Sequence, residues 1–143
     1  MQYAVDASIA AKWFIPEPHK DQAERLLRDF LEDKIQLIGP DLLVVEVGSL
    51  LWIRSTLRGD ISEAQAARSY EAFLALGIDL RPSRTIAAAA LKLAAEENHK
   101  VYDMMYVALA QHEGCELITA DQKLINKLSV RFPLLRWIGD FPI

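Results

Sequence analysis

The sequence predicts an α/β domain with a mostly parallel sheet. Short apolar segments of strand length alternate along the chain with longer segments of helical periodicity, and this alternation is typical of parallel sheets flanked by helices. The 143 residues are 52% hydrophobic and 25% charged, a composition that excludes a disordered or low-complexity chain. At this length we expect residues 1–143 to form one domain.

Five short apolar segments are expected to form the strands. The first ends at Asp6, and the second is closed by the turn signal Gly39-Pro40. All five are too short to be ordinary helices. The expected strands are Gln2–Val5, Ile35–Ile38, Ile78–Leu80, Glu116–Ala120 and Leu134–Ile138.

Two helices are expected between the first two strands. Ser8 suits the N-cap of a helix over Ile9–Ile15, and Pro16 and Pro18 end that helix. In Asp21–Asp33, apolar residues recur at i, i+3, i+4, i+7 and i+8, which is the spacing of one helix face.

Two more helices are expected between the second and third strands. Asp41–Leu57 is very apolar and too long for a strand, and Pro40 suits a helix start, so this segment is predicted to be a buried helix. Ser62 and Gln65 have the spacing of a capping box, which begins a helix that runs to Leu76. The three helices expected in the rest of the chain are Ser83–Glu97, Tyr102–His112 and Asp121–Leu128.

Several classes of protein are excluded or disfavoured. No apolar run reaches the roughly 18 residues of a membrane span, and the N-terminus lacks the pattern of a secretory signal. The single Cys115 excludes an internal disulfide framework. These features predict a cytoplasmic protein. The net charge of −4 argues mildly against a module that binds nucleic acid through bulk positive charge.

Polar residues that follow strands are candidates for a site, because ligands of open parallel sheets bind at the carboxyl ends of the strands. Asp6 follows the first strand and Asp121 follows the strand Glu116–Ala120. Each is also explained by a simple turn or helix cap, since aspartate is common in both positions.

Two further acids lie in apolar helical segments. Glu46 shares a helix face with leucines in the most apolar stretch of the chain, and a carboxylate on such a face is rarely buried unless paired. The alternative is a rotated helix that leaves Glu46 at the rim. Asp103 lies near a helix start, where it could simply complement the helix dipole.

If the four acids converge, they repel one another and require a cation. Two unit charges about 4 Å apart repel by roughly 4 kcal/mol at an effective dielectric constant near 20. Oxygen ligands favour Mg²⁺ or Mn²⁺, and the chain has no Cys/His pair at zinc spacing.

Four segments carry a family resemblance. They are AVDASIAAKWF (Ala4–Phe14), PDLLVVEVGSLL (Pro40–Leu51), VYDMMYVALA (Val101–Ala110) and LITADQKL (Leu117–Leu124). In this order and spacing, the sequence resembles the PIN-domain nucleases, and in size and layout the VapC-type toxins of toxin–antitoxin operons. The resemblance covers essentially the whole chain. It implies a five-stranded parallel sheet of order 3-2-1-4-5 flanked by helices.

The resemblance also implies which residues act. The catalytic and metal-binding acids would be Asp6, Glu46, Asp103 and Asp121. Ser8 and Thr119 match small hydroxyl residues that often flank the acidic site. Three residues after the glutamate, many toxins of this kind carry Asn, and Ser49 stands here, so its supporting role is in doubt.

The function implied is hydrolysis of RNA phosphodiester bonds with Mg²⁺ or Mn²⁺ held by the carboxylates. Lys12 and Lys123 lie near the motifs and could hold the RNA backbone, or they could be ordinary solvated lysines. The resemblance further implies a homodimer and a cognate VapB-like antitoxin, with the hairpin Asp41–Leu76 as a candidate groove wall. Trp13, Phe14 and Trp52 are candidate partner contacts, or core residues.

Three alternatives remain open. The chain could be a housekeeping PIN nuclease that processes RNA without an antitoxin, or a non-catalytic interaction domain with the same fold. A phosphatase of the haloacid-dehalogenase type also has an Asp after its first strand, but it needs a second Asp two residues later, where this chain has Ser8.

Overall fold

Fifteen elements alternate along the chain of this computed structural model, which describes all residues from Met1 to Ile143. The strands are short, and each follows at least one helix or begins the chain. They are β1 (Gln2–Val5), β2 (Gln36–Pro40), β3 (Asp79–Arg81), β4 (Glu116–Thr119) and β5 (Leu135–Trp137). The α-helices are α1 (Ala7–Phe14), α2 (Lys20–Leu31), α3 (Leu42–Trp52), α4 (Glu63–Ala75), α5 (Ala87–Glu97), α6 (Val101–Glu113) and α7 (Gln122–Leu128). Three short helical turns are η1 (Ile53–Leu57), η2 (Ser83–Thr85) and η3 (Ile138–Asp140).

The five strands form one parallel sheet of order β3-β2-β1-β4-β5, which confirms the predicted fold and strand order. The chain leaves β1 toward one edge through β2 and β3, and then returns to the other side of β1 with β4. The strand order therefore reverses between β1 and β4, where Val5 pairs with Ile118. This switch point is where open parallel sheets place their ligands.

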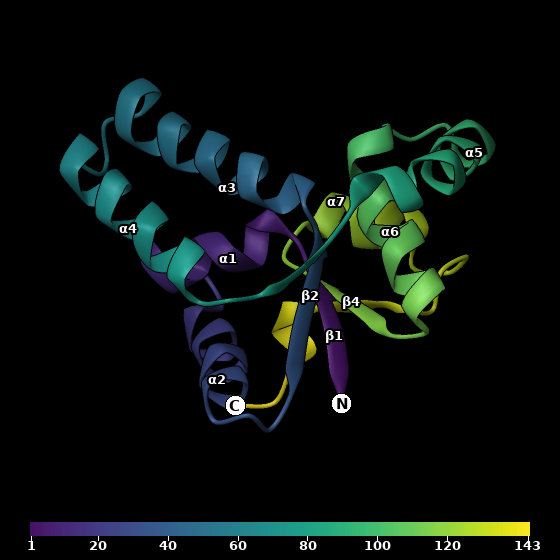
Figure 1. Ribbon diagram of the computed structural model, residues 1–143, viewed down its shortest axis with the longest axis horizontal. Helices are drawn as coiled ribbons and strands as arrows, with labels where there is room; N and C mark the ends of the chain where they lie inside the picture. Colours follow the sequence, from purple (N-terminus) through teal and green to yellow (C-terminus); the bar gives the residue numbers. More distant parts are fainter.

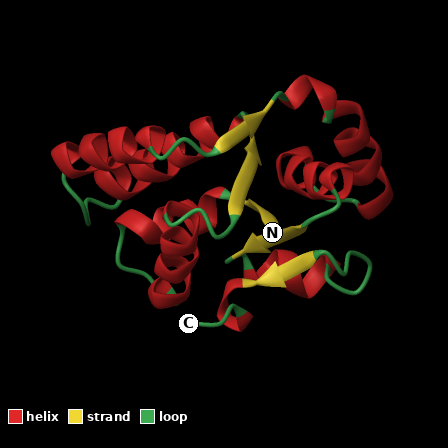
Figure 2. Cartoon of the chain, turned by 60° about the horizontal axis from the view of Figure 1, so that its bottom comes forward, coloured by secondary structure: helices red, strands yellow, loops and turns green.

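Helices cover both faces of the sheet, as Figure 2 shows with the strands between two groups of helices. Helix α6 packs on β1, β2 and β4, and α5 packs on α6. On the other side, α1 contacts α2, α3 and β4. Helices α3 and α4 form a hairpin that extends away from the sheet (Figure 1). The two helices of the hairpin approach closely because Gly48 of α3 has no side chain and leaves room for Tyr70 of α4. The Tyr70 hydroxyl donates a hydrogen bond to Val44 O at 2.6 Å.

The predicted N-cap of the first helix is wrong. Asp6 caps α1, because its Oδ1 accepts hydrogen bonds from Ser8 N at 3.1 Å and Ile9 N at 3.4 Å. Ser8 lies inside the first turn. Both residues are good caps, so the local preference alone does not choose between them. The capping box of Ser62 and Gln65 is present as predicted.

The predicted helix Asp41–Leu57 is regular only over α3. The next turn, η1, is wider, with π-helical hydrogen bonds. Ser55 Oγ donates to Leu51 O at 2.9 Å, a bond that competes with the helix ladder. Pro40 ends β2 rather than starting a helix, and the segment before α5 is the separate turn η2. The first strand, Gln2–Val5, is as predicted, and the remaining predicted boundaries lie within two residues of the observed ones.

One hydrophobic cluster of 35 buried residues joins the two faces of the sheet. Trp13 belongs to this core, and its Nε1 donates to Ala23 O at 2.9 Å, so it is not a partner contact. Trp52 is 53% exposed. No helix has both the length and the apolar character needed to cross a bilayer.

Candidate active site

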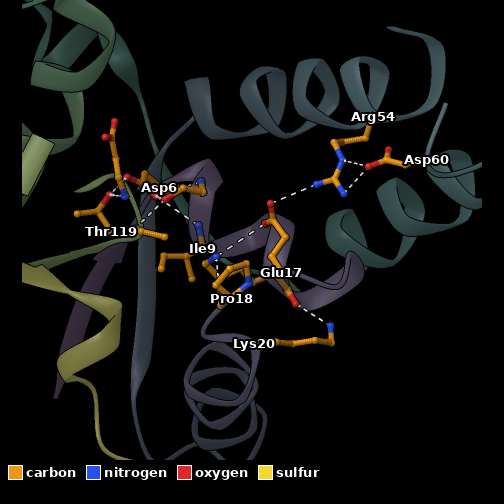
Figure 3. A network of polar contacts seen from close by, with 12 residues as sticks. Asp6, Ile9, Glu17, Pro18, Lys20, Arg54, Asp60 and Thr119 are labelled. Atoms are coloured by element: carbon orange, nitrogen blue, oxygen red, sulfur yellow. Dashed lines mark hydrogen bonds and ion pairs between the residues drawn. The ribbon is translucent and has the colours of Figure 1, made fainter. Parts of the chain in front are cut away.

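Asp6 lies directly after β1, at the switch point of the sheet. Both of its carboxylate oxygens are engaged by hydroxyls: Ser8 Oγ donates to Oδ1, and Thr119 Oγ1 donates to Oδ2, each at 2.5 Å. Thr119 ends β4 and is fully buried. Figure 3 shows Asp6 and Thr119 side by side. Two hydroxyls from different segments therefore hold the Asp6 carboxylate in one orientation.

The same two hydroxyls tie the ends of β1 and β4 together. Ser8 Oγ accepts a hydrogen bond from Ala120 N at 2.9 Å, and Thr119 Oγ1 accepts one from Asp121 N at 3.0 Å. The resemblance predicted that Ser8 and Thr119 flank the acidic site, and they do lie beside Asp6. Their contribution to catalysis stays a prediction.

Burial raises the pKa of Asp6 to about 6, despite the hydrogen bonds from Ser8 and Thr119 that favour its charged form. The negative charge of Asp103 adds to this increase in the pKa. At neutral pH, ionising a carboxylate held at such a pKa lowers the stability of the fold, and groups of this kind gather at functional sites.

Glu46 lies on α3, and its side chain is neither fully buried nor at the exposed rim. Its Oε2 accepts a hydrogen bond from the buried Tyr106 hydroxyl at 2.9 Å. Partial burial is the largest cause that raises the pKa of Glu46, and the charges of Asp6 and Asp103 raise it further. The three acids Asp6, Glu46 and Asp103 therefore lie close enough to repel one another.

Asp103 lies in the first turn of α6, and its contacts with His99 and Lys100 are both made through Oδ2. Its Oδ2 is 2.6 Å from Nε2 of His99 and 3.8 Å from Nζ of Lys100. Lys127 of α7 contacts the other ring nitrogen of His99, with 3.1 Å between Nζ and Nδ1. An ammonium group can only donate, so Nδ1 accepts and Nε2 carries the proton that is donated to Asp103. His99 thus orients the Asp103 carboxylate.

Asp121 is the N-cap of α7, where its Oδ1 accepts from Leu124 N at 3.1 Å. This satisfies the simple capping explanation for one oxygen and leaves the other without a protein hydrogen bond. Asp121 follows β4 on the opposite side of the switch point from Asp6, as predicted, but its part in a metal site stays a prediction.

The donor set suits a hard cation, because the clustered oxygens carry like charges that a divalent ion would neutralise. In this structure no three His, Cys, Asp or Glu side chains lie close enough together to hold a metal ion. Oxygens of Asp6, Glu46 and Asp103 are bound instead to hydroxyls or to His99. The Glu46 and Asp103 side chains would have to turn to share an ion with Asp6.

Lys12 is not available for RNA in this structure. It is buried, its Nζ donates to Pro18 O at 2.7 Å, and it lies 3.9 Å from Glu17. Burial lowers the pKa of Lys12. Arg54 of η1 also reaches Glu17, with 3.2 Å between Nη1 and Oε2 (Figure 3). Lys123 is exposed on α7 and forms no ion pair, so a role in RNA binding stays a prediction.

A groove with a volume of about 380 Å³ opens beside the acids. It contains Glu46 and Asp103 together with Ser49, so the residue that replaces the frequent Asn of the family does face the same groove as the glutamate. The other residues that line the groove are Ala7, Leu50, Ile53, Lys100 and Tyr102.

Two residues around the acids were not singled out from the sequence. The Tyr106 hydroxyl meets Glu46 across 60 positions of the chain, so no local spacing reveals the contact. His99 lies four positions before Asp103 but precedes α6, so the helical spacing rule does not apply and the sequence carries no clear signal of this contact.

Replacing Tyr106 by Phe tests whether the hydroxyl positions Glu46. We expect roughly tenfold lower RNA cleavage, within the range for loss of a group that orients a metal ligand. We also expect a loss of about 1 kcal/mol in the free energy of unfolding, as for one hydrogen bond. Cleavage kinetics and urea unfolding measure the two effects. Unchanged cleavage would show that Glu46 does not need this donor.

The comparisons with known proteins agree with each other. Residues 3–128 match the family model of the PIN domain. The chain is 35% identical over 138 residues to Ribonuclease VapC3 of Pyrobaculum aerophilum, and this match covers 94% of the chain and 98% of that protein. The crystal structure of PAE2754 from P. aerophilum is similar with a TM-score of 0.70 at 25% identity, covering 97% of this chain and 93% of that one.

Proposed function

The chain belongs to the PIN-domain family, and from this premise we propose that it is a metal-dependent endoribonuclease, the toxin of a VapC-type toxin–antitoxin module. The observation that carries the proposal is the grouping of three carboxylates: Glu46 and Asp103 line one groove, and the charge of Asp6 at the switch point reaches Glu46 and raises its pKa. The relative Ribonuclease VapC3 supports RNA as the substrate. One hydrophobic core and one sheet support residues 1–143 acting as a single domain.

We propose Mg²⁺ or Mn²⁺ as the cofactor, held by Asp6, Glu46 and Asp103, with Asp121 as a fourth ligand. When bound, such an ion supplies an activated water and charge neutralisation at the phosphate. The negative net charge of the chain is then no argument against RNA, because part of it belongs to the site where the cation binds.

The protein's own groups orient the reaction. Ser8 and Thr119 hold both oxygens of Asp6, so this carboxylate is preorganised by the fold. Glu46 faces the groove, and its Oε1 has no protein partner, so this oxygen is free either to hold the ion or, as the alternative role, to accept the proton of the attacking water. Its raised pKa makes it a better proton acceptor than an ordinary glutamate.

The proposed partners are RNA, a second copy of the chain and a VapB-like antitoxin. Several large apolar side chains of the hairpin are exposed, and exposed apolar patches are typical of protein interfaces. They are Val45, Trp52, Ile53 and Leu57. The hairpin therefore remains the best candidate for the antitoxin groove. Because its substrate would be cellular RNA, we propose that the protein acts in the cytoplasm.

The direct test is cleavage of a labelled RNA by the purified protein with Mg²⁺ or Mn²⁺, and again with EDTA. We expect cleavage only with the metal. Cleavage that persists in EDTA would reject the metal-dependent mechanism, and no cleavage with either metal would favour a non-catalytic domain. Co-purification of a small protein that inhibits cleavage would support the toxin, and an active enzyme with no such partner would favour the housekeeping nuclease.

A further inference from the structure

Tyr102 separates two hollows at the mouth of the candidate site. On one side lies the acidic groove of about 380 Å³ that contains Glu46 and Asp103. On the other side lies a smaller, mostly apolar pocket of about 210 Å³. Tyr102 lines both. The other residues that line the small pocket are Leu42, Ser83, Val101 and Met105.

The Tyr102 side chain contributes little to the fold. The residue is 59% exposed, and its hydroxyl has no hydrogen-bond partner in the protein. The continuous buried run of α6 begins only at Met104. An exposed aromatic ring beside a nucleic-acid site offers a flat face on which a base can stack, whatever the base.

Positive charge lines the acidic groove together with the Tyr102 ring and the acids. Lys100 precedes α6, its side chain is 68% exposed, and its charge lowers the pKa of Glu46. Helix α6 has no side-chain cap, so the N–H groups of its first turn are open to a phosphate oxygen. The edge of the acidic groove next to Tyr102 is therefore the place where a phosphate is best held.

We propose that the small pocket is a base-binding subsite for single-stranded RNA, in which the base next to the scissile phosphate stacks on Tyr102 while Lys100 contacts the phosphate. This inference rests on the proposed ribonuclease function. Because Tyr102 lines both hollows, a nucleotide with its phosphate beside Glu46 and Asp103 has its base within reach of the small pocket. The apolar lining matches the face of a base, and the lysine matches the charge of the backbone.

The test combines a protein variant with a missing base. Cleavage kinetics with Mn²⁺ are measured for wild type and Tyr102→Ala on a set of RNA oligonucleotides, each with one abasic nucleotide at a different position. For Tyr102→Ala on intact RNA we expect a KM raised about tenfold, as for loss of one stacked base, with kcat much less affected. At one position next to the cleaved bond, the abasic substitution should raise the KM of wild type by the same factor of about ten. It should leave the KM of Tyr102→Ala unchanged, because the variant has no ring on which the base could stack.

Two variants separate stacking from a structural effect. Tyr102→Phe keeps the ring and should keep the KM of wild type. Leu91→Ala removes a side chain of similar exposure, 62%, from α5, away from both hollows, and should leave KM and kcat unchanged. Lys100→Met should raise KM for intact and abasic RNA alike and weaken the dependence of KM on salt, because it removes a phosphate contact.

The outcomes distinguish the two proposals. If wild type cleaves no RNA, the ribonuclease function itself fails. If wild type cleaves RNA and Tyr102→Ala has the same KM as wild type, the base subsite is rejected. It is also rejected if the ratio of the variant's KM to that of wild type is the same for every abasic position. If Tyr102→Ala instead weakens only a co-purified protein partner, the pocket belongs to a protein interface and the subsite is rejected as well.

Discussion

Asp6→Asn is expected to lower RNA cleavage by about 1000-fold, because loss of one ligand charge removes several kcal/mol of metal-dependent stabilisation. The fold should survive. Asparagine is as good an N-cap as aspartate, so α1 keeps an acceptor for the N–H groups of Ser8 and Ile9. The neutral amide also avoids the burial penalty that raises the pKa of Asp6.

The measurement is single-turnover cleavage with saturating Mn²⁺, together with calorimetric titration of Mn²⁺. The variant should bind Mn²⁺ at least about tenfold more weakly, since a direct ligand contributes at least as much as a group that only orients one. Asp21→Asn is the matched control, because Asp21 is an exposed acid in the first turn of α2 and should leave both quantities unchanged. An Asp6→Asn enzyme with near-normal cleavage would remove Asp6 from the proposed mechanism.

The metal-free protein should lose stability as the pH rises from about 4 to about 7. The folded state raises the pKa of Asp6 from an ordinary 3.8 to about 6, so it binds this proton more tightly than the unfolded chain does. The stabilisation is fully present below the unfolded pKa and is lost as the pH rises through the folded one. Glu46 has a shift of the same sign. Because the Asp6 side chain keeps some contact with solvent, which screens the effect, we expect a loss of about 1–3 kcal/mol in the free energy of unfolding.

Thermal unfolding in EDTA across this pH range measures the effect, which corresponds to a decrease in Tm of roughly 3 °C or more. Mn²⁺ should raise Tm more at neutral pH than at pH 5, because it binds the ionised carboxylates. In Asp6→Asn the decrease in Tm should be much smaller. A stability profile of Asp6→Asn that matches wild type would mean that Asp6 titrates near its ordinary value.

The strand order was predictable because the four motif segments carry a family resemblance and the apolar alternation is regular. The position of Asp6 at the switch point follows from that order. Contacts between distant segments were not predictable. The bond from Tyr106 to Glu46 and the contact of Lys127 with His99 depend on how α6 packs against α3 and α7. Local rules also failed where two good candidates compete, as with Asp6 and Ser8 for the cap of α1.

The candidate site joins a well-protected helix to a more exposed hairpin. Every residue of α6 from Met104 to Ala110 is buried, whereas η1 has no buried residue and α4 has only Phe73. Amide hydrogens in α6 should therefore exchange with solvent only on global unfolding, while those of η1 and α4 exchange through local opening. Hydrogen exchange should therefore show that α6, which carries Asp103, opens last, and that η1, which follows the helix of Glu46, is among the first segments to open.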